Sequence, residues 1–597
     1  MHVVVVPAGE ASLTLHDIDV APLGDTGVDA GAVQVRTSAV VPAADLAALV
    51  HERESAAEPP RWVWSDTAAL YPPLLAEGVS VARCWDLRLC HTILRTSALT
   101  ADSTLATAPP SGWDEARVAS PVQDGLFDLA PSVPLDPVAE MRRQREALAG
   151  ATALDGSSAS ARLGLLLAAE SAGALVAAEM TFAGVPWDAA EHDRILADAL
   201  GPRPSAGFRP SLLEAKLAEV REALGVDDLN PDSPAELLRQ LRSAGLAVAS
   251  TRSWELRGVE HPAIKPLLEY KKLSRLLTAN GWHWLDTWVA DGRFRPVYVP
   301  GGVVTGRWAS DGGGALQLPH QVRGAVRADP GWTLVVADAA QLEPRILAAM
   351  SGDEAMARAG QAADMYEGMV ATGAVETRQQ AKYGMLGAMY GGTQGESGRM
   401  LPRITKAYPQ ALALVEHAAR AGERGQVVST WLGRSSPLPG GAWRAAQEAA
   451  ADQEATAADQ DRARGLARGW GRFTRNFVVQ GTAAEWALCW MALLRLRLRA
   501  LDGPAVPGAA PRPAGGPHLA FFLHDEVMVH SPAGQADEVA RIVEETAAEA
   551  GRLLFTDARV EFRVTVATVR SYADAKGVAT DLPLPALEND LEGDAEV

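Results

Sequence analysis

Cysteine is scarce in this sequence, with three residues in 597: Cys84, Cys90 and Cys489. Their spacing gives neither the paired pattern of a disulfide framework nor the CxxC pairs of a zinc site, so both classes are excluded. Clean apolar runs of about 20 residues are also missing, because Ser, Arg, Gly or Glu interrupts each stretch, including the one from Ala159 to Ala178. We therefore expect buried, reduced thiols and no membrane span.

Positive charge is in deficit, since 55 Lys and Arg face 74 Asp and Glu, for a formal net charge of -19. Such a deficit argues against nucleic-acid binding, because phosphate contacts are made by Lys and Arg. Part of the deficit is local, however: residues 581–597 hold six acids and no base, which is typical of a disordered tail. The start, MHVVVVPAGE, lacks the cationic region of a secretory signal, so we expect a cytoplasmic protein.

The composition that remains, 48% apolar and 22% charged, is that of a globular protein with several domains. Short β-type runs and helical pieces share residues 1–150, and a polar linker near 149–160 follows. Helical periodicity then runs to about residue 285, strand and turn signals cover 294–336, and helices dominate again to about 500. This order predicts a multidomain protein that combines α/β and α+β regions.

Two aspartates occupy strand ends. Asp338 closes the apolar run WTLVVAD before an amphipathic helix that carries Gln341, Glu343 and Arg345, and Asp525 lies in a tight turn between the apolar strands of LAFFLHDEVMVH. Mg²⁺ prefers carboxylate oxygens and is commonly held by one or two carboxylates together with substrate phosphates. Each aspartate alone is most simply a cap or turn residue, but as a pair they suit phosphoryl transfer with two metal ions.

A basic helix is predicted between these aspartates. In ETRQQAKYGMLGAMYGG, residues Arg378, Lys382, Leu386 and Tyr390 follow one another at i,i+4 spacing and can share one face. The cations can neutralise a triphosphate, and the tyrosine can stack on a base. The alternative is a surface helix with salt-bridged cations and a buried tyrosine. A further helical segment, RFTRNFVVQGTAAEW, places Arg472, Asn476 and Gln480 at the same spacing. Such polar side chains can hydrogen-bond to base edges in the minor groove, or they can be ordinary polar residues of a helix.

Taken in order, these segments resemble DNA polymerase family A, the group that includes bacterial DNA polymerase I. The resemblance covers roughly residues 160 to 575. It is carried by the following stretches, in chain order: AAEMTFAGVPWD, LLEYKKLSRL, TGRWAS, ALQLP, ADAAQLEPR, RQQAKYGMLGAMYG, WLGRSSPLP, RNFVVQGTAAE and FLHDEV.

The resemblance implies a right-hand polymerase of palm, fingers and thumb, preceded by a small ribonuclease H-like α/β domain of the 3′–5′ exonuclease type. The implied parts are a degenerate exonuclease-like domain (1–150), thumb and entry to the polymerase region (160–300), first part of the palm (301–360), fingers (361–465), second part of the palm (466–580) and acidic tail (581–597). The implied function is template-directed DNA synthesis in replication or repair. Expected partners are primer–template DNA and deoxynucleoside triphosphates, with two Mg²⁺ ions as cofactors, and we expect a monomer associated with the nucleoid.

Residue roles follow from the same resemblance. Asp338 and Asp525 are implied to bind the metal ions, with Glu526 beside the second. The implied nucleotide-binding residues are Arg378, Lys382, Leu386, Tyr390, Gln341 and Glu343; Lys382 would also protonate pyrophosphate, and Glu343 would exclude a ribose 2′-hydroxyl. The implied primer–template contacts are Arg307, Arg472, Asn476, Gln480, His524 and the thumb cations Lys271, Lys272 and Arg275.

Some positions depart from the family pattern. Leu386 stands where an aromatic residue is usual, which leaves the handling of chain-terminating nucleotides open, and Ala339 and Pro344 replace a tyrosine and a leucine. Residues 1–150 contain one tyrosine, Tyr71, without an aspartate four positions later, and their nearest match to the exonuclease Asp-x-Glu is Asp17-Ile18-Asp19. We therefore expect proofreading to be lost, and a separate protein to supply the 5′ nuclease.

Two other functions are compatible with these residues. A related single-subunit RNA polymerase would share both aspartates and the basic helix, but Glu343 and the His-Asp-Glu turn favour DNA. A catalytically dead DNA-binding scaffold would have no physical need of both aspartates together with Arg378, Lys382 and Tyr390.

Overall fold

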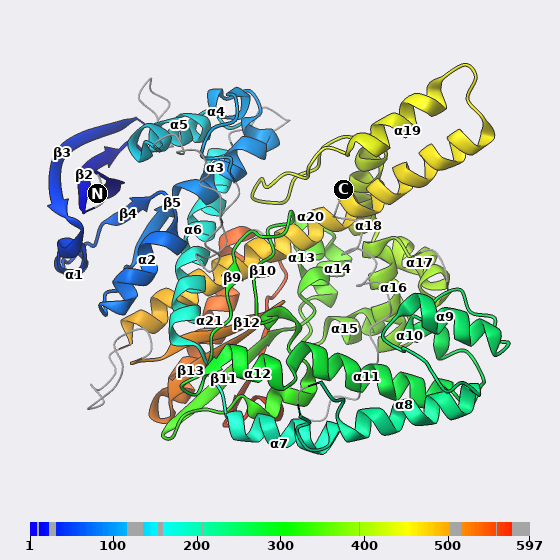
Figure 1. Cartoon of the computed structure of the whole chain (residues 1–597). Helices are drawn as coiled ribbons and strands as arrows, with labels where there is room; N and C mark the ends of the chain where they lie inside the picture. The colour runs from blue at the N-terminus through cyan, green and yellow to red at the C-terminus, as the bar shows by residue number, and fades with distance from the viewer. Residues whose placement is uncertain are drawn as a thin grey trace. The chain divides into compact units, whose positions relative to one another are not determined.

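The computed structural model describes residues 1–8, 11–22, 32–115, 135–152, 159–205, 207–392, 395–501, 515–556 and 558–575 (Figure 1). The chain divides into two compact units. The first comprises Met1–Ala183, Val297–Asp311 and Val335–Thr568, and the second comprises Gly184–Pro296, Gly312–Leu334 and Val569–Val597. The predicted acidic tail lies outside the described residues, as do most of the loop near residues 503–517 and most of the predicted linker.

The first unit begins with a mixed five-stranded sheet in the order β3-β2-β1-β4-β5. Its strands are β1 (His2–Pro7), β2 (Ser12–Val20), β3 (Val33–Pro42), β4 (Arg61–Trp64) and β5 (Arg83–Asp86). β1 pairs antiparallel with β2 and parallel with β4, with Val4 opposite His16 on one side and Val63 on the other. Val3, Val4 and Val5 are buried because β1 is central.

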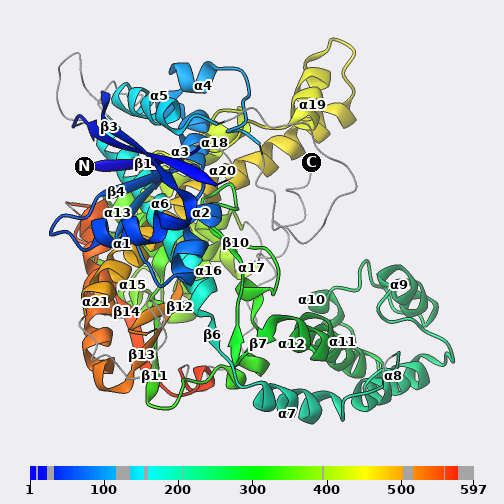
Figure 2. The same cartoon turned by 60° about the vertical axis from the view of Figure 1, so that its left-hand side comes forward.

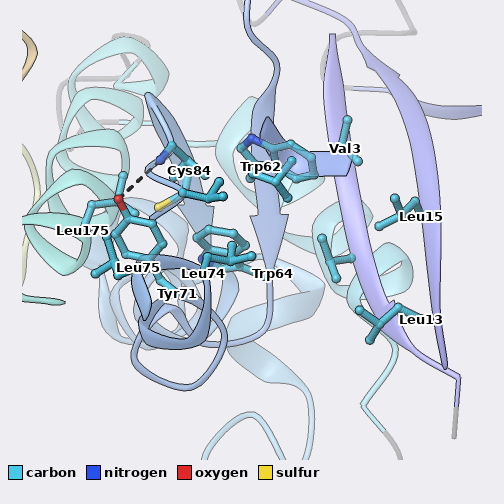
Figure 3. Packing of buried hydrophobic residues seen from close by; sticks show 14 residues of the cluster. Val3, Leu13, Leu15, Trp62, Trp64, Tyr71, Leu74, Leu75, Cys84 and Leu175 are labelled. Atoms are coloured by element: carbon cyan, nitrogen blue, oxygen red, sulfur yellow. Dashed lines mark hydrogen bonds between the residues drawn. The ribbon is translucent and has the colours of Figure 1, made fainter. Parts of the chain in front are cut away.

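Helices accompany this sheet, and Asp66 and Asp86 cap two of them by accepting backbone N–H bonds. The helices are α1 (Leu46–Glu54), α2 (Thr67–Ala76), α3 (Leu87–Thr96), α4 (Thr104–Thr107), α5 (Pro137–Ala149) and α6 (Ser160–Ala183). Figure 3 shows the core that the sheet shares with α2 and α6, in which Trp62, Trp64 and Tyr71 are fully buried. All three cysteines are buried free thiols, which confirms that prediction.

A second sheet of the first unit has the order β12-β13-β11-β14. Its strands are β11 (Trp332–Ala339), β12 (His518–Leu523), β13 (Glu526–Pro532) and β14 (Val564–Val569), and a two-stranded sheet pairs β9 (Tyr298–Val299) with β10 (Ala309–Ser310). Helices α13 (Leu342–Ser351), α20 (Ala457–Ala500) and α21 (Ala536–Leu554) belong to the same unit. Strands β11, β12 and β13 are almost entirely buried, as their apolar sequences require.

The other helices of this unit lie between β11 and α20 in sequence. They are α14 (Glu354–Ala359), α15 (Met365–Ala371), α16 (Arg378–Tyr390), α17 (Gly395–Ala407), α18 (Pro409–Glu423) and α19 (Gly441–Ala451). By length and composition α6 and α20 could cross a membrane, but 72% and 89% of their apolar windows are buried inside the fold. Burial therefore accounts for their apolar sequences.

The second unit is mostly helical and has its own core. Its elements are β6 (Val185–Pro186), α7 (Ala189–Leu200), α8 (Ser211–Leu224), α9 (Pro234–Ser243), α10 (Ser253–Leu256), α11 (Ile264–Asn280), α12 (Trp282–Trp288), β7 (Val289–Ala290) and β8 (Arg293–Phe294). Figure 2 shows α8, α9 and α11 grouped together. These helices bury Leu217, Leu237 and Tyr270 in one cluster. Ser233 caps α9 by accepting the Glu236 backbone N–H, and Pro234 begins the helix.

The mixed helix-and-sheet architecture predicted from the sequence is thus confirmed. The compact units do not follow the predicted boundary at residue 160, because α6 belongs with the N-terminal sheet and with α20 in the first unit. Its side chains explain why: Glu179 of α6 binds Arg495 of α20 and the hydroxyl of Tyr71 of α2. The predicted domain names remain a prediction.

Candidate functional site

The two predicted metal-binding aspartates come from neighbouring pieces of backbone. Asp338 is the penultimate residue of β11, and Asp525 lies in the two-residue turn between Leu523 and Glu526, which face each other across β12 and β13. The Ala339 N–H donates a hydrogen bond of 3.0 Å to the Asp525 carbonyl. That bond brings Asp338 and Asp525 to one edge of the β12-β13-β11-β14 sheet, although they are 187 positions apart in the sequence.

The side chains at this edge suit a hard divalent cation. Asp338 and Asp525 are half-buried, whereas Glu526 is 3% exposed and points with β13 into the fold. Within the described part of the chain, no three His, Cys, Asp or Glu side chains form a metal-binding group. A pair of carboxylates nevertheless fits Mg²⁺, whose remaining positions are commonly filled by water and substrate phosphates.

Arg345 holds the turn that follows Asp338, a role that the sequence did not reveal. Its guanidinium is 1% exposed and donates to the Ala340 carbonyl at 2.7 Å. Its other acceptors are carbonyls of distant segments, those of Gly360, Glu561, Ala362 and Ala363. Burial lowers the pKa of Arg345. Because Gln341 in this turn has a positive φ of 49°, the local backbone is strained and depends on such support.

Four predicted site residues form one chain of hydrogen bonds. The Tyr390 hydroxyl, at the end of α16, donates to Glu343 of α13 at 2.5 Å and receives an N–H from Gln480 of α20 at 3.5 Å. Arg307 in turn donates to the Gln480 side-chain oxygen at 3.1 Å. Burial, and next the charge of Glu343, raises the pKa of Tyr390, so the hydroxyl stays protonated and remains a donor. The structure therefore brings together α13, α16, α20 and the segment of Arg307, whose contacts no local sequence pattern predicts.

The start of α16 is anchored by an acid from a neighbouring helix. Arg378 donates to Asp364, the N-cap of α15, at 2.8 Å, and its guanidinium lies 5.6 Å from the ring centre of Tyr366. Gln341 accepts the Met365 backbone N–H at 3.0 Å and so ties α15 to the turn after Asp338. Arg378 is 48% exposed, so its charge remains accessible to a ligand. Lys382 and Leu386 are half-buried on the same helix.

Arg472, Asn476 and Gln480 do lie at helical spacing on α20, but in different environments. Arg472 is exposed, with its stem beside Gly391 at the end of α16, while Asn476 is 5% exposed and Gln480 9%. The side-chain oxygen of Asn476 is buried and accepts no hydrogen bond within the described structure. Leaving a buried acceptor unpaired is costly, and such atoms in native proteins often belong to binding sites. His524 is exposed at the tip of its turn, with φ of 58°.

A buried ionic network lies behind Arg307 and Gln480. Glu485 of α20 accepts the Leu432 N–H at 2.9 Å and a short bond from the Thr430 hydroxyl. Arg434 from the same loop pairs with Glu170 of α6 at 2.7 Å. Burial raises the pKa of Glu485 to about 7. Glycine at position 481 allows α20 to approach the loop that carries Thr430 closely. A Cβ there would lie 2.4 Å from the Thr430 side chain and 3.1 Å from the Thr305 carbonyl oxygen.

Glu485→Gln is expected to make stability less sensitive to pH. The pKa of Glu485 is raised on folding, so its contribution is fully present below 4.5 and is lost as pH rises through about 7. Glutamine resembles the protonated acid. The rise of the pKa from 4.5 in the unfolded chain to about 7 in the folded protein corresponds to roughly 3 kcal/mol of unfolding free energy, by which the variant should be the more stable protein above pH 7. Thermal melting of both proteins between pH 4.5 and 8 measures this effect. The difference in stability in favour of the variant should grow up to about pH 7 and then stay constant. A difference independent of pH would contradict the assignment.

The predicted thumb cations are all on α11, in the second unit. Lys272 and Arg275 are exposed, whereas Lys271 is half-buried and donates to the Thr251 carbonyl at 2.7 Å. Burial lowers the pKa of Lys271. Of the three, Lys272 and Arg275 are therefore better disposed to meet an external phosphate.

Comparison with known proteins gives consistent matches. The chain is 26% identical over 352 residues to the thermostable DNA polymerase I of Thermus filiformis, covering 54% of this chain and 37% of that enzyme. It is 26% identical over 369 residues to DNA polymerase I of Chloroflexus aurantiacus, covering 56% and 35%. The chain thus matches little more than a third of the length of these relatives.

A solved structure shares the fold across almost the whole chain. It is the polymerase domain of Pol1 from M. smegmatis in complex with DNA primer-template and dNTP, with a TM-score of 0.62 at 18% sequence identity. The match covers 96% of this chain and 95% of that one. The model of the family described as DNA polymerase family A matches residues 213–574, more than half of the sequence and the whole region that carries the site described above. This chain belongs to DNA polymerase family A.

Proposed function

We propose that this protein is a template-directed DNA polymerase, which adds deoxynucleoside triphosphates to a primer 3′-hydroxyl. The observation that carries the proposal is the meeting of Asp338 and Asp525 at one sheet edge, beside the hydrogen-bonded chain from Glu343 to Arg307. The Pol1 domain of similar fold is a complex with primer-template and dNTP, which supports the same partners here. Phosphoryl transfer needs positioning and charge stabilisation and no covalent intermediate.

In this proposal Asp338 and Asp525 bind divalent metal ions, and the number proposed is two Mg²⁺ ions. When bound, such ions stabilise the attacking and leaving oxygens of an in-line displacement. Arg378 and Lys382 bind the triphosphate from α16, and Asp364 keeps the Arg378 guanidinium in place until the nucleotide arrives. Lys382 donates the proton that the departing pyrophosphate takes up.

The buried polar groups of α20 are proposed to read the primer end through the minor groove. The Asn476 oxygen is an acceptor without a donor inside the described structure, and the minor groove offers a donor at guanine N2. Arg307 and Gln480 are already ordered by their mutual hydrogen bond of 3.1 Å, so little side-chain entropy is lost when they meet a base pair. Arg472 and His524, both exposed, contact the template and the primer terminus.

Tyr390→Phe is expected to weaken discrimination against ribonucleotides. The proposed barrier to a 2′-hydroxyl is Glu343, and the Tyr390 hydroxyl holds its carboxylate at 2.5 Å. Losing a hydrogen bond to a charged group is worth about 1.5–3 kcal/mol, so the ratio of kcat/KM for deoxy- over ribonucleotides should fall by roughly 10- to 100-fold. Gln379→Ala, on the exposed side of α16, is the matched control. An unchanged ratio in Tyr390→Phe would show that Glu343 needs no such support.

Primer extension tests the function itself. Purified protein is given a primed DNA template, Mg²⁺ and either deoxy- or ribonucleotides, and extension with deoxynucleotides alone is expected. Efficient extension with ribonucleotides would favour the RNA polymerase alternative. Binding of the primed template without extension by either nucleotide set would favour a non-catalytic scaffold.

We further propose that the N-terminal sheet is a degenerate exonuclease-like scaffold without proofreading activity. Asp17 and Asp19, the nearest match to the expected motif, are engaged by basic side chains: Asp17 by Arg53 at 2.5 Å and Asp19 by Arg36. Thr37 also donates to Asp17 at 2.7 Å. Degradation of a mismatched primer 3′ end that disappears in Asp17→Ala would overturn this. The monomeric state, the cytoplasmic, nucleoid-associated location and the separate 5′ nuclease stay predictions.

A further inference from the structure

Residues 428–436 form a turn that the proposed metal and nucleotide sites do not include. The Thr430 N–H closes this turn by donating to the Arg434 carbonyl at 2.8 Å. Glu485 of α20 accepts the Leu432 N–H at 2.9 Å with one carboxylate oxygen, and with the other it accepts a short bond from the Thr430 hydroxyl. Because both oxygens of this buried acid hold the turn, the backbone of the 428–436 turn is fixed to α20.

Arg434 extends from this turn to the segment that carries Arg307. Arg434 is 9% exposed and pairs with Glu170 of α6 at 2.7 Å. Gly306 and Arg307 lie in the loop between β9 and β10, and Figure 1 shows β9 beside α6. A Cβ on Gly306 would lie 2.4 Å from the Arg434 Nε atom, and Gly306 has a φ of 86°, so glycine is required there. The Arg434 guanidinium therefore defines where the backbone next to Arg307 lies.

These contacts form a closed ring that begins and ends on α20. Glu485 holds the 428–436 turn, and Arg434 of that turn packs against the segment of Arg307. Arg307 donates at 3.1 Å to Gln480, which lies five residues before Glu485 on the same helix. Since each member is held by the next, the ring fixes the Arg307 guanidinium relative to α20. A change at Arg434 should therefore displace that guanidinium.

The N-terminal region contacts the same turn through the segment that follows α3. Ser97 caps the short helix η2 (Ala98–Thr100), is 1% exposed, and donates from its hydroxyl to the Gly433 carbonyl at 2.7 Å. Gly433 has a φ of 112°, and a Cβ there would lie 2.4 Å from a methyl carbon of Leu99. The two segments are thus in close contact, and the 428–436 turn joins the N-terminal region to the ring on α20.

We propose that Arg434 is a positioning residue for Arg307, and that the N-terminal region acts on the primer-end contact through the 428–436 turn. This role rests on the proposed polymerase function, in which Arg307 meets the minor groove at the primer end. A correctly paired end presents its minor-groove acceptors where Arg307 can reach them, whereas a mispaired end displaces them. Displacing Arg307 should therefore penalise matched primers more than mismatched ones.

Single-nucleotide addition to a matched and to a mismatched primer end tests this role in the whole chain. Arg434→Met keeps most of the side-chain stem and removes the guanidinium. It should lower kcat/KM for the matched primer by about 10-fold, the loss that corresponds to one hydrogen bond from a charged group, and for the mismatched primer by much less. The ratio of the two kcat/KM values should thus fall several-fold. Equal losses on both primers would contradict the proposal.

A double-mutant cycle separates positioning from a general effect on the fold. In the Arg307→Ala background Arg434→Met should cause no further loss on the matched primer, because the side chain that it positions is already gone. If Arg434→Met costs as much there as in wild type, Arg434 does not act through Arg307 and the proposal is overturned. Glu179→Leu/Arg495→Met is the matched control, since it removes another buried ion pair of α6 and should leave the ratio unchanged.

Ser97→Ala tests the contribution of the N-terminal region and leaves every buried ion pair intact. The ratio of matched to mismatched kcat/KM should fall by about 2- to 3-fold, and it should not fall in the Arg307→Ala background. Thr67→Ala removes another buried hydroxyl of the N-terminal region, one that bonds to Trp64, and should leave the ratio unchanged. An unchanged ratio in Ser97→Ala would overturn the proposed link to the N-terminal region.

The positioning role and the polymerase function fail in different ways. If wild type extends the matched primer but Arg434→Met keeps the wild-type ratio, the polymerase proposal survives and the positioning role alone fails. If wild type extends neither primer, the polymerase proposal fails, and the positioning role fails with it.

Discussion

Asp525→Ala is expected to lower the rate of nucleotide addition by about 1,000-fold or more while leaving primer–template binding intact. The proposed metal ions stabilise transition-state charge by several kcal/mol, and each 1.4 kcal/mol is tenfold in rate. The fold should tolerate the change, because the bond that Asp525 makes to Ala339 uses its backbone carbonyl and survives in alanine. The loss should therefore appear in kcat for single-nucleotide addition and not in the Kd for DNA measured by anisotropy.

Two variants make that result specific. Asp525→Asn keeps the size of the side chain and removes only its charge, so it should lose nearly as much activity as alanine. Asp537→Ala removes an exposed acid from the first turn of α21 and should retain full activity. Retention of activity within about tenfold of wild type in Asp525→Ala would place the metal elsewhere. Equal melting temperatures of wild type and the three variants would show that differences in activity arise from the chemical step and not from unfolding.

The elements around the site could be predicted from the sequence because their signals are local. An apolar β-branched run ending in Asp338 makes β11, and two apolar runs around His524 and Asp525 make the hairpin. The i,i+4 spacing along α16 and α20 likewise depends only on helical period. What these patterns did not reveal is that Tyr390, Glu343, Gln480 and Arg307 touch, since that depends on how three helices and a loop pack.

The residues that support the site were missed for the same reason. Arg345 looks like an ordinary helix cation, and its role is defined by carbonyls at positions 360 to 363 and 561 that only the fold brings within reach. Glu485 carries no motif, and its raised pKa arises from burial against a loop some 50 residues earlier. Gln341 and His524 adopt positive φ without being glycine, which sequence propensity argues against. Such departures from local preference are typical of functional sites.

Glu179→Ala is expected to cost about 3–5 kcal/mol, the largest loss of stability that we predict for a single substitution in this chain. Arg495 is 4% exposed and binds both carboxylate oxygens of Glu179, at 2.6 and 2.8 Å. Burial opposes the charge on each partner, but the opposite charge outweighs it, so the pKa of Glu179 is lowered and that of Arg495 raised. Removing the carboxylate leaves a buried guanidinium without its counter-charge, held by neutral acceptors such as the Val81 and Ala82 carbonyls.

The double variant decides whether the ion pair or the packing matters. Glu179→Leu/Arg495→Met replaces both charges by apolar side chains and should be much closer to wild type in melting temperature than Glu179→Ala, because no uncompensated charge stays buried. The contact also joins α6 to α20 and, through the Tyr71 hydroxyl, to α2 of the N-terminal sheet. Glu179→Ala should therefore speed limited proteolysis within residues 1–150 before the rest of the first unit is cut. If the single and double variants melt alike, loss of packing and not of charge pairing sets the cost, and the N-terminal sheet is held to α20 by apolar contacts.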